Sequence, residues 1–224
     1  MNHNKELWLS LVAMVLIAGL YTLILILTRQ IPPAAGLFGH LLGILGFLLM
    51  LLTETLYTLR KKSQSARWGK MSDWLEFHIF TGLVGPFMVL LHSSWKFNGL
   101  AGAVMLMTLL IVASGFVGRY IYTAIPRTAE GVEIQADALE QLILQIDRQI
   151  VQLDSINPHS QKLLKQKRDL KNEKRKLINN VKSLGRTRKW MAIWHAIHIP
   201  LGMGLFAAAF IHITGAIYYA TLLH

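Results

Sequence analysis

Four histidines have a spacing that could support chemistry. His78 and His92 lie fourteen residues apart in one apolar stretch, and His198 and His212 lie fourteen apart in another. An α-helix turns about 100° per residue, so fourteen residues bring a side chain back to within about 40° and advance it by roughly 21 Å. Each stretch, if helical, would therefore carry two imidazoles on one face, separated by about two-thirds of a bilayer's hydrocarbon core.

Two such helices facing each other would bring the imidazoles together as two stacked couples. Imidazole is a common iron ligand, and a couple of imidazoles can hold one haem. The chain has no Cys, which excludes disulfides, thiolate-bound zinc, Cys-ligated iron–sulfur clusters and the covalent attachment of c-type haem. The expected cofactors are therefore two haem b groups. Their iron ligands would be His78, His92, His198 and His212.

The composition indicates that a membrane positions these histidines. The chain has 224 residues, of which 53% are hydrophobic, yet it holds 23 Lys and Arg against 12 Asp and Glu. The charges are segregated, because long uncharged runs alternate with short basic loops, as in multi-span membrane proteins. Membrane orientation explains this basic excess more simply than nucleic acid does, so lipid is an expected partner and nucleic acid is not.

The apolar runs predict an all-α integral membrane protein with five transmembrane helices that form a haem-binding bundle. The first run has no obvious small-residue cleavage site, so we interpret it as a retained helix. The loop at 60–70 carries five cations and no acid, which predicts a cytoplasmic loop, a cytoplasmic N-terminus and an external C-terminus. The predicted spans are 8–27, about 36–59, 73–93, 100–123 and 190–222.

This span count decides how the histidines pair. The third and fifth spans run in the same direction, so His78 would pair with His198 near the cytoplasm and His92 with His212 near the outer face. His195 competes with His198, but it lies about 100° away from the face that carries His212. We therefore favour His198 as the ligand.

Two further histidines lie within or beside the spans. His195 could lie near a propionate or a quinone headgroup, or be an interfacial polar residue. His40 has no partner at the same spacing. We interpret it first as a packing residue or a polar group at a substrate site, and only second as a ligand.

Small residues occupy the middle of both histidine stretches. They would leave room for a flat haem, although glycine in membrane spans also allows close helix packing. Pro86 and Pro200 could kink the helices and adjust the aim of the imidazoles. The glycines are Gly82, Gly85, Gly202 and Gly204.

Two cations are candidates for binding haem propionates. Arg119 lies near the cytoplasmic end of the fourth span, where it could pair with a propionate of the inner haem or extend to the lipid headgroups. Lys96 follows the third span on the outer side, where it could meet the outer haem.

A polar segment of some sixty residues separates the fourth and fifth spans. Its apolar residues follow helical spacing, which predicts an antiparallel coiled-coil hairpin in the cytoplasm with Asn157 and Pro158 at the turn. The hairpin would serve for docking or self-association, or as a spacer. The predicted organisation is spans one to four at 1–124, the hairpin at 125–189 and the fifth span at 190–224. The spaced residues are Leu139, Ile143, Ile146, Ile150 and Leu153, then Leu163, Leu170, Leu177 and Leu184.

The two His-x13-His stretches on the third and fifth spans resemble the transmembrane domain of ferric reductases and NADPH oxidases. The same spacing resembles the dihaem core of respiratory cytochrome b. The resemblance covers roughly 35–222 and implies bis-histidine haem b sites. The flavin- and nucleotide-binding domain that follows the last span in the oxidase families, and the quinol-site motifs of respiratory cytochrome b, are not in this sequence. Neither NAD(P)H use nor a particular quinone site is therefore implied.

We therefore expect a dihaem cytochrome b subunit that transfers electrons across a bacterial cytoplasmic (inner) membrane. It would belong to a membrane oxidoreductase complex, between quinol or quinone and a multihaem cytochrome or iron–sulfur subunit. Glu54 and Glu76 could accept quinol protons, or be ordinary interfacial charges. Two alternatives are a histidine-based metal or proton transporter and a non-catalytic membrane anchor with a partner-binding hairpin.

Overall fold

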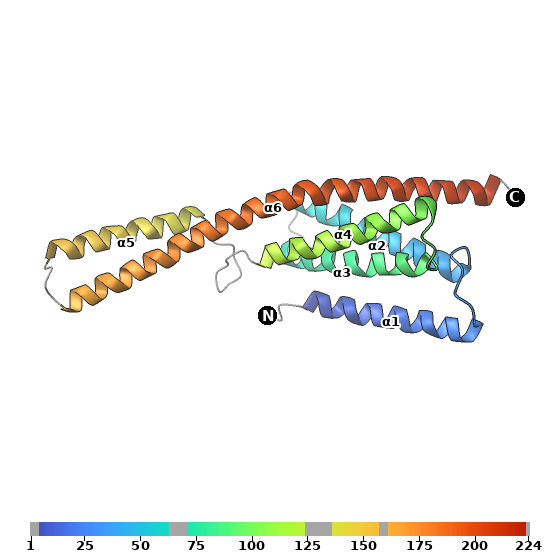
Figure 1. Cartoon of the computed structure of the whole chain (residues 1–224), viewed down its shortest axis with the longest axis horizontal. Helices are drawn as coiled ribbons and strands as arrows, with labels where there is room; N and C mark the ends of the chain where they lie inside the picture. The colour runs from blue at the N-terminus through green and yellow to red at the C-terminus, as the bar shows by residue number, and fades with distance from the viewer. Residues whose placement is uncertain (1–4, 63–70, 124–135, 157–160, 223–224) are drawn as a thin grey trace. The chain divides into compact units, whose positions relative to one another are not determined.

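The computed structural model describes residues 5–62, 71–123, 136–156 and 161–222, and the described part of the chain is helical with no strand. Figure 1 shows the helices in chain order. They form two compact units, 1–115 with 198–224, and 116–197. The helices are α1 (Lys5–Thr28), α2 (Leu37–Lys62), α3 (Met71–His92), α4 (Gly99–Thr123), α5 (Ala136–Ile156) and α6 (Gln161–Leu222).

The predicted helical architecture is confirmed. Within the described ranges, five helices are long and apolar enough to cross a membrane, and the first four begin and end close to the predicted bounds. The break between α1 and α2 falls at Pro32 and Pro33, where proline cannot continue a helix. Most of the basic loop lies outside the described residues.

Helix α6 is longer than the span predicted at 190–222. It is a single α-helix of 62 residues that includes the second predicted arm of the hairpin and contains Pro200. No helix end separates this arm from the apolar run, because the residues around Trp190 include neither proline nor a turn sequence.

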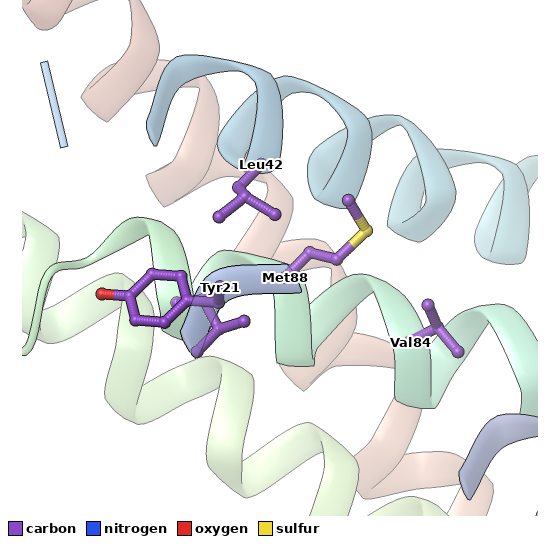
Figure 2. Close-up of a cluster of buried hydrophobic side chains, with 5 residues drawn as sticks. Tyr21, Leu42, Val84 and Met88 are labelled. Atoms are coloured by element: carbon purple, nitrogen blue, oxygen red, sulfur yellow. The ribbon is translucent and has the colours of Figure 1, made fainter. Parts of the chain in front are cut away.

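Helices α1, α2 and α3 share a buried apolar cluster in the first unit. Tyr21, Leu42, Val84 and Met88 are its labelled members in Figure 2, and Leu91 completes it. A second cluster joins α2, α4 and α6, so the first unit is held together by side chains from five helices. The members of this second cluster are Met50, Val104, Leu205 and Ala209.

Helices α2 and α3 approach closely at a pair of glycines. A Cβ atom on Gly85 would lie 2.9 Å from the Gly46 carbonyl oxygen, and a Cβ on Gly46 would lie 2.8 Å from the Gly85 carbonyl oxygen. Nearby, the Thr53 hydroxyl donates to the Thr81 hydroxyl at 2.7 Å. At Gly85 the structure supports the close-packing interpretation, because small residues let helix backbones approach.

In the second unit, α5 and the start of α6 have their less exposed residues at the predicted apolar positions. Leu139, Ile146 and Leu184 are buried. Lys174 on α6 pairs with Asp147 on α5 at 2.5 Å. This pair links α5 to the first part of α6, which lies beside it in Figure 1. Asn157 and Pro158 lie outside the described residues, and coiled-coil packing stays a prediction.

Replacing Gly85 with Ala should destabilise the fold. The added methyl group would push against the Gly46 carbonyl, and overpacking of this kind costs about 1–3 kcal/mol. Thermal unfolding in detergent should show a lower midpoint for Gly85→Ala. Gly19→Ala is the matched control, because nothing lies within 4 Å of the position of its Cβ. Equal midpoints for the two variants would contradict the proposed contact.

Candidate functional site

His92, the last residue of α3, fits into a niche on α2. Its Nδ1 atom lies 2.8 Å from the Gly39 carbonyl oxygen. One turn further along α2, a Cβ atom on Gly43 would lie 2.9 Å from ring atoms of His92. Gly43 therefore leaves the space that the imidazole occupies, while the Gly39 carbonyl sets its orientation.

This hydrogen bond also selects the tautomer of His92. A carbonyl oxygen can only accept, so Nδ1 carries the proton and donates it. In a neutral imidazole the lone pair is then on Nε2, the nitrogen that can bind a metal. Backbone or carboxylate acceptors on the second ring nitrogen are typical of metal-binding histidines.

His78 has the same arrangement, two helical turns before Gly85 on α3. Its Nδ1 lies 3.2 Å from the Thr53 carbonyl oxygen on α2, and Glu54 is within electrostatic reach of the ring. His78 lies seven residues before Gly85 and Thr53 lies seven after Gly46. The two histidines of α3 are therefore held by the same helix through the same ring nitrogen.

His92 belongs to a group of three histidines from three helices: His40, His92 and His212. His40 on α2 and His212 on α6 are both within electrostatic reach of His92. The rings of His40 and His92 are 6.5 Å apart between centroids, at an interplanar angle of 32°. The structure thus brings His92 near His212, the residue with which the spacing predicted it to pair, and adds His40 beside them.

His198 on α6 is anchored to α4. Its Nδ1 lies 2.5 Å from the Ser114 hydroxyl oxygen, and both residues belong to the first unit. His195 differs, because its Nδ1 lies 3.0 Å from the Met191 carbonyl of its own helix and its ring lies 4.7 Å from Trp194. His198 thus contacts another helix through Ser114, whereas these contacts of His195 lie within α6.

Gly202 and Gly204 of α6 face α4. A Cβ atom on Gly204 would lie 3.0 Å from the methyl carbon of Met107, and one on Gly202 would lie 3.8 Å from Ile111. On α3, a Cβ on Gly82 would lie 3.6 Å from Thr53. Gly82 and Gly202 thus have room for a methyl group, and Gly204 is in tight contact only with the flexible end of Met107.

The two predicted propionate-binding cations lie in different settings. Lys96 is exposed in the turn after α3, where its backbone N–H donates to the Ser93 carbonyl at 2.9 Å. The same turn holds Ser94 and Trp95 at positive φ, and the Ser94 hydroxyl fixes it by donating to the Pro32 carbonyl at 2.6 Å. Arg119 is half-buried in the second unit.

Glu76 lies on a groove between α1 and α3. The groove has a volume of about 490 Å³, and its lining combines charged residues with apolar ones. Glu6, Asp73 and Lys5 supply the other charges, and Phe77 is among the apolar residues. Glu54 lies on α2, near His78.

Sequence reasoning missed the residues that hold the histidines: Gly39, Gly43, Thr53 and Ser114. A signal was present, because Gly39 and Thr53 are also fourteen residues apart and Gly46 is their midpoint. Across the described ranges, no group of three or more His, Asp or Glu side chains is placed to hold a metal ion. A haem couple needs only two imidazoles.

No protein-family model, curated protein or solved structure matches the chain. Its function is therefore argued from its own residues.

Proposed function

We propose that this chain is a dihaem cytochrome b subunit that transfers electrons across a membrane. The observation that carries the proposal is the matched anchoring of His78 and His92 to α2 carbonyls fourteen residues apart. A helix-packing histidine needs one partner at any position. Two stacked ligand sites require two histidines on the same helix face, each held through the same ring nitrogen and each in the same tautomer.

The exposed apolar surface supports insertion into a membrane. Large apolar side chains on α1 are open, for example Leu16 at 69% and Leu27 at 73% exposure, and other helices carry many more. Exposing apolar side chains to water over several helices is unfavourable, whereas lipid tails solvate the same surface. The basic loop at 60–70 favours a cytoplasmic N-terminus and hairpin and an external C-terminus.

The residues present fit two haem b groups. His78 with His198 would hold the inner one, and His92 with His212 the outer one. A haem at each couple would supply an iron that exchanges one electron between its ferric and ferrous states. The protein orients three of the four imidazoles: His78 through Thr53, His92 through Gly39 and His198 through Ser114. Lys96, in the same unit as the four histidines, would pair with a propionate of the outer haem.

A lipid quinol is the proposed membrane substrate, and the groove between α1 and α3 is the proposed place for it. Its volume is within the range of small-molecule sites. Oxidation of a quinol to a quinone gives up two electrons and two protons. Glu76 and Asp73 supply carboxylates that can accept the protons, while the apolar residues suit the ring and tail. A multihaem or iron–sulfur subunit would be the other redox partner.

Substitution of the four ligands tests the pairing. His92→Leu and His212→Leu should each remove the same haem, and His78→Leu and His198→Leu should each remove the other, because one imidazole cannot complete a couple. Measuring haem per chain, and the midpoint potential of the haem that remains, shows which of the two haems each variant has lost. His40→Leu and His195→Leu are the matched controls and should keep both haems.

Gly43→Ala complements this series if a histidine variant fails to fold, because it adds only a methyl group against the His92 ring. It should shift the midpoint potential of the outer haem alone. The pairing would be wrong if the His92 and His212 variants lost different haems.

Glu76→Gln tests the quinol groove. The amide cannot accept a proton, so the rate at which a short-chain quinol reduces the haems should fall by about 100-fold, the low end for general-base catalysis. Stopped-flow absorbance measures this rate at unchanged haem content. Glu140→Gln is the control, because Glu140 is exposed on α5. A wild-type rate for Glu76→Gln would rule out this role.

A further inference from the structure

The positive charge of the chain is concentrated in the polar segment between α4 and the last apolar run. Residues 136–190 hold 13 Lys and Arg against six Asp and Glu, a net charge of +7 out of the chain's +11. Twelve of these cations belong to 161–190, on α6. Even if every acid in the segment paired with one cation, seven cations would lack an acidic partner there.

Six of the cations form a line on one face of α6, which we call the cationic stripe. Their spacing of three, four, seven, four and three residues keeps them within an arc of about 60° over roughly 31 Å of helix. All six are exposed. They are Arg168, Lys171, Arg175, Lys182, Arg186 and Lys189.

The cationic stripe is turned away from the side of α6 that contacts α5. Leu170, Leu177 and Leu184 lie about 130–170° around the helix from the stripe's centre, and these leucines are on the less exposed side. Lys174, which pairs with Asp147 of α5, lies about 90° around the helix from the stripe's centre, between the stripe and these leucines. Asp147 of α5 therefore pairs with a cation outside the stripe. The cationic stripe remains accessible to another protein.

An anionic membrane would reach only one end of the stripe. Residues 161–197 are an uninterrupted part of α6, and the apolar run begins at Trp190. Arg186 lies about 6 Å before Trp190 along the helix axis, whereas Arg168 lies about 33 Å before it. Attraction to a charged surface decays over about 8 Å at physiological salt, so Arg168, Lys171 and Arg175 lie beyond its range.

We propose that the cationic stripe docks an acidic α-helix of a partner protein. The stripe is straight and its cations follow steps of three, four or seven residues, so carboxylates at the same steps on a second helix can meet successive cations. A nucleic-acid duplex curves away from a straight line of charges and would meet fewer of them. Like charges along the stripe repel each other, and an acidic helix relieves that repulsion. The inference does not depend on haem binding.

A designed peptide tests the docking. The probe is a labelled helical peptide of about 25 residues, long enough to cover the stripe, with glutamates at the matching steps. The full chain is held in nanodiscs of neutral phosphatidylcholine, and binding is measured by fluorescence anisotropy at about 150 mM salt. Lys171→Gln with Lys182→Gln removes two stripe charges. Lys165→Gln with Lys176→Gln is the matched control, because both are exposed cations outside the stripe.

The stripe variant should bind the peptide about fivefold more weakly, from two exposed charge pairs, and the control should stay within about twofold of wild type. A peptide of the same composition with scrambled glutamates should bind more weakly than the matched peptide. Equal losses in the two variants, or equal binding of both peptides, would overturn the proposal. So would tighter binding of phosphatidylglycerol vesicles or of a short DNA duplex, which would assign the stripe to lipid or to nucleic acid. Haem content, measured on the same samples, reports separately on the proposed function.

Discussion

One antiparallel register between α2 and α3 is the constraint on which the candidate site depends. Gly46 meets Gly85 at its centre, and the pairs Thr53–His78 and Gly39–His92 lie seven residues to either side. A slip of one residue would turn both histidines away from their carbonyls and bring side chains together where only glycine fits. The close approach at the centre and the histidine anchors at the ends therefore support each other.

The anchors matter because an apolar environment leaves a histidine few alternatives. An imidazole away from water needs a partner for its N–H group, and a backbone carbonyl supplies one without introducing a charge. That choice places the proton on Nδ1 and the lone pair on Nε2 of His78 and His92. Packing thus orients both rings of α3 through the same nitrogen. His198 of α6 is oriented by the Ser114 hydroxyl of α4 and not by a backbone carbonyl.

The sequence predicted the apolar helices well, because long uncharged runs between prolines and cations permit few other structures. The histidine spacing predicted His92 and His212 as a pair; the two lie within electrostatic reach of each other, and the pairing itself stays a prediction. The supporting residues were not predicted: Gly43 and Ser114 act through contacts between helices, which depend on crossing distance and rotation rather than on any local pattern. The uninterrupted α6 was missed because a change from polar to apolar composition does not end a helix.

Haem content tests the central claim most directly. The purified full chain, expressed in a haem-sufficient host, should contain two b-type haems per chain by pyridine haemochrome assay. Its reduced-minus-oxidised spectrum should be that of low-spin, bis-histidine iron. Absence of b-type haem, or a single haem that survives replacement of both His92 and His212 as well as replacement of both His78 and His198, would contradict the account.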